Sequence, residues 1–219
     1  MSRPTVTIGT PPADLMDFPV VKTADLPAEL FRIFHHRHHS TGAVNPPWRF
    51  SSVPPGESRF DIDQPQGTCY WSDRRYGCWV EVWRGTRMVD RADVTRRDLF
   101  TAKAPTLRLA NTLARATRRF GMTSELSAPI PYDVPQTWAR AVHTAGFAGL
   151  VGLCRHDPSL TARTFAVFGP AGMVARRTGW TTRRSAILAD AQLAAELAEL
   201  GVQVAAVPYA VPVGAPTVL

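Results

Sequence analysis

One helical pattern of apolar positions lies within residues 76–83. Tyr76, Trp79, Val80 and Trp83 recur at the i, i+3, i+4 and i+7 spacing that places side chains on one face of a helix. The apolar runs on either side are shorter, and several of them alternate as strands do. The pattern therefore predicts a buried helix in the middle of a chain that mixes strands and helices.

The remaining periodic segments predict further strands and helices along the chain. We expect strands at 30–34, 68–71, 88–89, 106–113, 149–153, 164–168 and 202–207, and further helices at 133–146 and 185–200. Ser72 or Asp73 is expected to cap the central helix, and Gly146 and Gly201 to end the later two. Because strands and helices do not alternate regularly, an α+β fold is predicted, with a central mixed or antiparallel sheet and flanking helices.

The length of 219 residues suits one domain of ordinary to large size. Residues 1–25 are rich in proline and threonine and are expected to form an N-terminal arm, and residues 26–219 to form the domain. Since no run of 18 apolar residues occurs, we expect no membrane span. The first 20 residues lack the layout of a secretion signal, so a cytoplasmic location is expected.

The net charge of +7 comes almost entirely from arginine, since Lys22 and Lys103 are the only lysines. Arginine suits bidentate binding of phosphate and carboxylate groups. The charge is compatible with nucleic acid, a dinucleotide or an acidic protein, and does not choose among them. The three cysteines, Cys69, Cys78 and Cys154, lie at no zinc-ligand spacing and indicate reduced thiols.

Four histidines gather at His35–His39, at the start of a long loop that reaches residue 58. A metal site is one interpretation, but Arg37 would place a positive charge at the ion and no second group of ligands lies nearby in sequence. We therefore predict no metal site and a solvent-facing basic loop. A loop of this length inside a compact domain is more often functional than neutral.

A cation, an aromatic ring and a carboxylate follow one another at equal spacing as Arg59, Tyr70 and Glu81. These groups suit a cationic sugar nucleotide. Each also has a structural interpretation: Glu81 on its helix could simply pair with Arg74 or Arg84 in solvent. Arg32, on the opposite face of its strand from Phe31 and Ile33, is either a snorkelling surface residue or a buried one with an anionic partner.

The order of motifs resembles the RES domain family, the toxin half of toxin–antitoxin pairs. The resemblance is clearest over residues 26–170, and the role of residues 171–219 stays open. The segments that carry it are Leu30–Ile33, Arg59–Phe60, Gly67–Tyr70, the helix with Glu81, Phe120–Gly121, Gln136–His143, Ala145–Leu150 and Arg155–Asp157.

The resemblance implies a fold similar to that of ADP-ribosyltransferase toxins and an enzyme that degrades NAD by hydrolysis or phosphorolysis. NAD would be a substrate, with inorganic phosphate as a possible second one, and no cofactor is expected. By position, the resemblance assigns catalytic roles to Arg32, Tyr70 and Glu81 and substrate binding to Arg59 and Cys154. It also implies an Xre-type antitoxin as partner, contact with nucleic acid only through that antitoxin, and a possible homodimer.

The chain departs from the family pattern at Cys154, where the family has serine, and at Gly152, where tyrosine is common. Cysteine preserves size but is a weak hydrogen-bonding partner. Two other hypotheses therefore stay open. One is a RES-like protein that binds NAD without turnover. The other, motivated by charge and by the basic run Arg115–Arg119, is an RNA-binding protein or ribonuclease.

Overall fold

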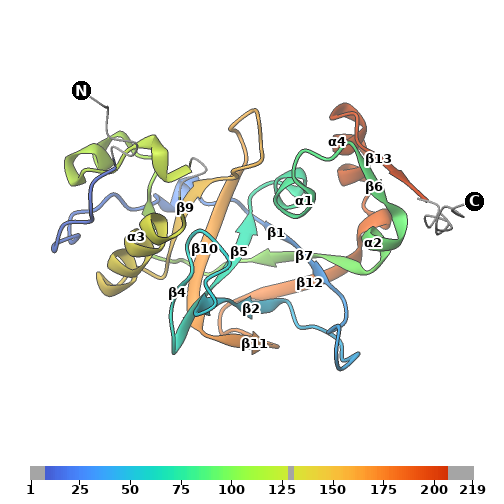
Figure 1. Ribbon diagram of the computed structural model, residues 1–219, viewed down its shortest axis with the longest axis horizontal. Coiled ribbons are helices and arrows are strands. Elements are labelled where there is room, and N and C mark those ends of the chain that lie inside the picture. Colours follow the sequence, from blue (N-terminus) through green and yellow to red (C-terminus); the bar gives the residue numbers. More distant parts are fainter. Residues whose placement is uncertain (1–7, 128–130, 207–219) are drawn as a thin grey trace, which may run out of the picture.

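The computed structural model describes residues 8–127 and 131–206 (Figure 1). Its helices are α1 (Arg75–Trp83), α2 (Arg91–Thr95), α3 (Asp133–Thr144) and α4 (Ala191–Glu199). Its strands are β1 (Leu30–His35), β2 (Trp48–Phe50), β3 (Ser52–Val53), β4 (Ile62–Asp63), β5 (Gln66–Ser72), β6 (Met88–Asp90), β7 (Arg97–Lys103), β8 (Leu109–Asn111), β9 (Gly149–Leu153), β10 (Arg163–Pro170), β11 (Gly172–Val174), β12 (Thr181–Ala186) and β13 (Gln203–Ala205). The predicted α+β class is confirmed.

A mixed seven-stranded sheet in the order β12-β7-β1-β5-β10-β9-β8 forms the centre of the fold. Strands β8 and β9 run parallel, and the other neighbours are antiparallel. The pairing is uneven at one place. β5 pairs with β10 along its whole length, whereas its register with β1 holds one pair, Phe31 with Ser72. The two strands therefore diverge beyond that pair, in the middle of the sheet.

Alternation of side chains along the strands divides the interior into three clusters. One face of the sheet is covered in two separate places. Residues of α3 and of segment 8–18 cover the β8–β9–β10 end, and residues of α1 and α4 cover β1 and β7. The other face packs against Trp48 and Phe50 of β2. In Figure 1, α3 lies at one end of the molecule and α2 and α4 at the other, which leaves the middle of the sheet between them.

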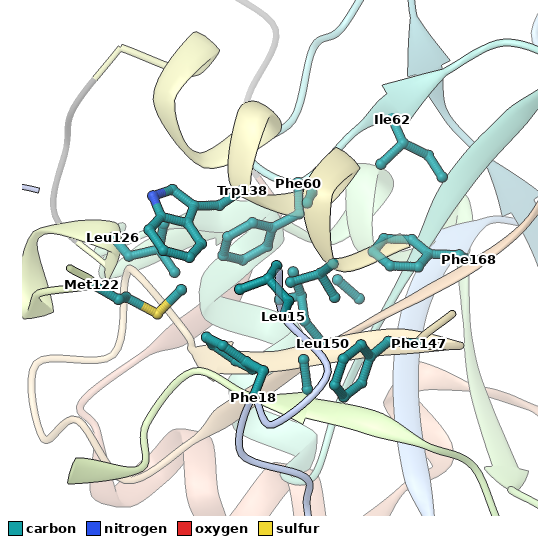
Figure 2. Close-up of a cluster of buried hydrophobic side chains, with 14 of the residues drawn as sticks. Leu15, Phe18, Phe60, Ile62, Met122, Leu126, Trp138, Phe147, Leu150 and Phe168 are labelled. Carbon is teal, nitrogen blue, oxygen red and sulfur yellow. The ribbon is translucent and has the colours of Figure 1, made fainter. Parts of the chain in front are cut away.

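The first cluster shows how the N-terminal segment joins the domain (Figure 2). Leu15 and Phe18 pack with Trp138 of α3 and Phe147, and the Trp138 indole nitrogen donates to Gly9 O at 3.0 Å. Because Trp138 is fully buried, this bond satisfies a donor that would otherwise be costly. Phe60 belongs to the same cluster, so the residue next to Arg59 is anchored in the core.

Several predicted elements differ in detail. The predicted helix at 185–200 was wrong at its start: Ser185 and Ala186 belong to β12, and α4 begins only at Ala191. Asp190 caps that helix by accepting from Leu193 N at 2.8 Å. Strand β7 was not predicted, because two of its inward positions are the buried polar residues Asp98 and Thr101.

The cap predicted for α1 was also wrong, whereas Gly146 and Gly201 follow α3 and α4 with φ values of 77° and 66° and end these helices as predicted. The N-cap position of α1 is Arg74, which makes no side-chain capping bond, and the Ser72 hydroxyl instead accepts from Arg74 N. The long loop at 35–58 contains β2 and β3 and so is partly regular. Of the last predicted strand, Val207 lies outside the described residues.

Candidate functional site

A cavity of about 310 Å³ opens where β1 and β5 diverge, between the two helical coverings of the sheet. Its walls come from β1, β5, α1, the loop before β4 and the turn after β9. The lining residues are Phe31, Arg32, Ile33, Glu57, Ser58, Arg59, Tyr70, Trp71, Ser72, Cys78, Glu81, Val82, Arg84, Tyr132, Arg155, His156 and Thr164. Arg32, Arg59, Tyr70 and Glu81, distant in sequence, therefore meet at one cavity.

Arg59 is a buried cation at the wall of this cavity. Its guanidinium donates to Leu153 O at 2.8 Å and to Ser127 O at 3.3 Å, and lies 4.7 Å from the centre of the Phe60 ring. Burial lowers the pKa of Arg59, while the nearby Glu81 carboxylate opposes that shift. Both hydrogen-bond partners are neutral carbonyls. Since a guanidinium has five N–H donors, donors remain that can bind an anion in the cavity.

Tyr70 of β5 points toward the turn that contains Phe60 and Asp61, and its hydroxyl forms hydrogen bonds with both residues. The hydroxyl donates to Asp61 Oδ1 at 2.9 Å and accepts from Phe60 N at 2.8 Å. Burial, with a further contribution from Asp61, raises the pKa of Tyr70 well above its ordinary value. Asp61 itself is fully buried, and burial raises its pKa to about 6.

Glu81 stands on the second turn of α1, on the side of the helix next to the buried stripe. The predicted stripe is confirmed: Trp79 and Val80 are buried against the sheet. Among the described residues Glu81 forms no ion pair, so the pairing with Arg74 or Arg84 is not seen. Its Oε1 accepts only a long bond, 3.4 Å, from His156 N. The carboxylate is thus exposed at the cavity and available to a ligand.

The sequence places two small residues, Gly77 and Cys78, one turn before Glu81, where they were expected to leave room for a ligand to approach the carboxylate. Gly77 leaves no room for a ligand, because a Cβ there would lie well under 3.0 Å from Ser72 Oγ and 3.3 Å from Cys154 Sγ. Glycine instead allows α1 to approach β5 closely. The expectation that both small residues make space was wrong for Gly77, whereas Cys78 does line the cavity.

Arg32 lines the cavity at the divergence of β1 from β5, but its guanidinium lies on the other face of the sheet. There Nη1 contacts Cys69 Sγ and lies 3.5 Å from Arg49 O, and the cation is 4.7 Å from the centre of the Phe34 ring. Cys69 points away from Tyr70, since neighbours on a strand face opposite sides. The guanidinium groups of Arg32 and Arg59 therefore lie on opposite faces of the sheet, so the two cannot bind one phosphate group together.

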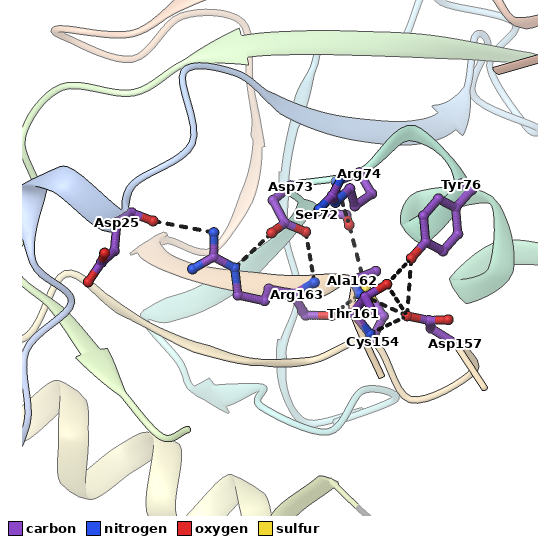
Figure 3. A network of polar contacts seen from close by, with 11 residues as sticks. Asp25, Ser72, Asp73, Arg74, Tyr76, Cys154, Asp157, Thr161, Ala162 and Arg163 are labelled. Atoms are coloured by element: carbon purple, nitrogen blue, oxygen red, sulfur yellow. Dashed lines mark hydrogen bonds and ion pairs between the residues drawn. The ribbon is translucent and has the colours of Figure 1, made fainter. Parts of the chain in front are cut away.

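Cys154 lies behind the cavity wall and does not line it. The thiol is fully buried and lies 3.5 Å from Ser72 Oγ (Figure 3). It is also 3.3 Å from Thr164 Oγ1. Burial raises the pKa of the Cys154 thiol to about 12, which makes it a poor nucleophile. Ser72 and Thr164 both line the cavity. Hydroxyl groups therefore stand beside the position where the family pattern has serine.

The turn that follows Cys154 is fixed by one buried carboxylate. Asp157 accepts from Thr161 N and Ala162 N, each at 2.8 Å, from Ser159 at 2.7 Å and from Tyr76 OH at 3.3 Å (Figure 3). These bonds lower the pKa of Asp157 although burial opposes the shift. The turn places His156 and Arg155 at the cavity, so Asp157 has a structural role.

Sequence reasoning missed part of the charge at this site. Arg84 and Arg155 line the cavity beside Arg59, against the two carboxylates Glu57 and Glu81. Arg84 ends α1 with a φ of 56°, a conformation that is strained for a residue other than glycine. Its place directly after a predicted helix was the available signal. The excess of cations indicates an anionic ligand.

The histidine cluster at His35–His39 lies outside the cavity lining. His38 and His39 stack on one another, and His38 contacts the Ser40 hydroxyl. Within residues 8–127 and 131–206, no group of three or more histidine, cysteine or acidic residues is arranged to hold a metal ion. In the same part of the chain, no helix is both long enough and apolar enough to cross a membrane.

Fold and site together define an α+β protein with an arginine-rich cavity that is lined by the exposed carboxylate of Glu81. The RES domain family model matches residues 29–190, about three quarters of the chain, and the chain belongs to that family. The match extends beyond the residues 26–170 where the resemblance was clearest and includes β11 and β12.

A solved structure with a related outline is the M. tuberculosis MbcT–MbcA toxin–antitoxin complex. The likeness has a TM-score of 0.49 and 12% identity, over 80% of this chain and 90% of the other. A comparison with curated proteins gave no match.

Proposed function

We propose that the protein is a toxin-like enzyme that cleaves the nicotinamide–ribose bond of NAD. The observation that carries the proposal is the meeting of Arg59, Tyr70 and Glu81 at one cavity whose lining is rich in arginine. Membership of the RES domain family supports it, because the NAD-degrading activity is what the family resemblance implies.

The residues suit the charge changes of this reaction. Cleavage of the bond builds positive charge on the ribose, as in glycoside hydrolysis. Glu81, which lacks an ion-pair partner among the described residues, is placed to stabilise that charge. Arg59, with Arg155 and Arg84 at the cavity, suits the pyrophosphate. The leaving group is neutral nicotinamide, so the site requires no strong general acid.

The acceptor is either water or inorganic phosphate, and one experiment separates them. Purified protein is incubated with NAD, with and without phosphate, and the release of free nicotinamide is followed. The ADP-ribosyl product is identified by its mass in mass spectrometry. Hydrolysis gives ADP-ribose in both conditions, and phosphorolysis gives ADP-ribose 1″-phosphate only when phosphate is present. Absence of nicotinamide under both conditions contradicts the proposal.

Binding of NAD without turnover is the second candidate, and the burial of Cys154 behind Ser72 and Thr164 motivates it. Here calorimetry would detect NAD binding, no nicotinamide would appear, and Cys154→Ser would restore cleavage. Full activity of the wild-type protein excludes this candidate.

An Xre-type antitoxin that closes the cavity is the partner we propose with this activity, on the family resemblance. Co-purification with the product of an adjacent reading frame tests it, with inhibition of nicotinamide release as the readout. Release that is unchanged in the complex contradicts the idea that the partner blocks this cavity. A cytoplasmic location and a homodimer stay predictions.

A further inference from the structure

The turn that carries Arg59 is held against β5 by three hydrogen bonds to two successive residues, Phe60 and Asp61. Tyr70 OH accepts from Phe60 N at 2.8 Å and donates to Asp61 Oδ1 at 2.9 Å. Thr68, which shares a face of β5 with Tyr70, donates from Oγ1 to Phe60 O at 2.7 Å. Both backbone groups of the residue after Arg59 are thus bonded to side chains of one strand.

The Asp61 carboxylate closes this turn on itself. Its Oδ2 accepts from Ser58 N at 2.9 Å, while Asp61 N donates to Ser58 O at 3.3 Å. Arg59 lies inside the closed turn, and within residues 8–127 and 131–206 its side chain donates to the carbonyls of Ser127 and Leu153. Fixing the backbone on both sides of Arg59 fixes the direction in which its guanidinium leaves the turn.

Asp61 is unusual because it is buried with no cation paired to it among the described residues. It is 0% exposed, and its bonds come from one hydroxyl and one backbone amide. A buried carboxylate is costly unless its oxygens are bonded. Asparagine would present an N–H₂ group to one of these two donors, so only the carboxylate satisfies both.

We propose that Asp61 and the Tyr70 hydroxyl act together as a latch that holds the 58–61 turn and so positions Arg59 at the cavity. Tyr70 then serves the site through the backbone of this turn, and not by supplying a proton or a free hydroxyl to the ligand. Asp61 is a positioning residue, since it acts through Tyr70 and the turn.

The first test measures the turn directly and needs no substrate. Amide hydrogen exchange is compared for Ser58 and Phe60 in wild-type protein, Tyr70→Phe and Asp61→Asn. Tyr70→Phe removes the acceptor of the Phe60 amide, and we expect that amide to exchange about tenfold faster or more. The Ser58 amide is expected to accelerate similarly in Asp61→Asn. Gln136, which donates to Gly56 O and Ser58 O, still anchors the start of the turn.

Tyr76→Phe is the matched control for this measurement. This substitution removes the Tyr76 hydroxyl, which bonds to Asp157 and Thr161, outside the 58–61 turn. Exchange at Ser58 and Phe60 is expected to stay at the wild-type rate in this variant. Unchanged exchange in Tyr70→Phe, or equal acceleration in Tyr76→Phe, overturns the latch.

The second test rests on the proposed function and uses the kinetics of NAD cleavage. Because Arg59 is expected to bind the pyrophosphate in ground and transition states alike, each latch variant should raise KM about tenfold and change kcat less. The two substitutions break one unit, so the double variant should resemble either single one. Additive losses, or a fall confined to kcat, contradict the latch. Failure of wild-type cleavage removes the proposed function, and the exchange test still decides the latch.

Discussion

Substitution of Gly77 by alanine tests the close approach of α1 to β5, which brings Glu81 to the cavity. An added Cβ would lie well under 3.0 Å from Ser72 Oγ, 3.0 Å from Ala162 Cβ and 3.3 Å from Cys154 Sγ. Ser72 has no long flexible side chain to move aside, and rotation of its hydroxyl loses the bond from Arg74 N. The helix therefore has to move away from the strand.

The magnitude follows from three contributions. Overpacking of this kind costs about 2 kcal/mol. Loss of the hydrogen bond at Ser72 costs about 1 kcal/mol. The better helix propensity of alanine returns about 1 kcal/mol. Gly77→Ala should therefore lower the free energy of unfolding by about 2 kcal/mol, seen as a lower urea midpoint with an unchanged m value.

Gly85→Ala is the control for this prediction, because a Cβ at Gly85 meets nothing within 4 Å. We expect its free energy of unfolding to stay within about 0.5 kcal/mol of the wild-type value. Nicotinamide release should fall in Gly77→Ala, since Glu81 moves with α1, and should persist in Gly85→Ala. A Gly77→Ala protein as stable as wild type would contradict the close packing of α1 on β5 at Gly77.

Three further predictions address other parts of the site. Cys154 should resist iodoacetamide in the folded protein at pH 8 and react after unfolding in urea, because burial raises its pKa to about 12. Mass spectrometry detects the label, and modification of Cys154 in the folded protein would contradict this prediction. Asp157 has a folded-state pKa below its unfolded value, so its stabilisation is present above about pH 4 and is lost as pH falls through the folded pKa. Asp157→Asn should therefore flatten the acid limb of a plot of stability against pH, and an unchanged limb would count against the fixed turn. Arg59→Lys should weaken NAD binding in calorimetry by about tenfold or more, because lysine cannot reproduce both carbonyl bonds and still bind an anion, and equal affinity would refute this.

Local periodicity was sufficient for the elements whose buried faces are apolar. β1, β5, α1 and α3 lie where their alternation or helical stripe predicted them. β7 could not be found in this way, because its Asp98 is buried and forms an ion pair with Arg184 of the neighbouring strand β12. The start of α4 was predicted too early in the sequence, because pairing with β7 holds Ser185 and Ala186 in strand β12.

The order of motifs predicted which residues meet at the cavity, but not how they are held. Arg59, Tyr70 and Glu81 do line one cavity, and their catalytic and binding roles stay predictions. The bond from Tyr70 to Asp61 and the position of Cys154 behind Ser72 depend on contacts between segments, which spacing does not encode. Arg32 shows the converse, since alternation correctly placed it on the opposite face of β1 from Phe31 and Ile33, and its guanidinium therefore lies away from Arg59.

In the proposed reaction, the Glu81 carboxylate supports cleavage of NAD in this cavity. The most direct measurement compares nicotinamide release by wild type, Glu81→Gln and Glu199→Gln. Glutamine preserves shape and removes the charge, whereas Glu199 is an exposed residue of α4 away from the cavity lining. We expect a loss on the order of 100-fold or more in Glu81→Gln and wild-type rates in Glu199→Gln. Equal release by wild type and Glu81→Gln would contradict it.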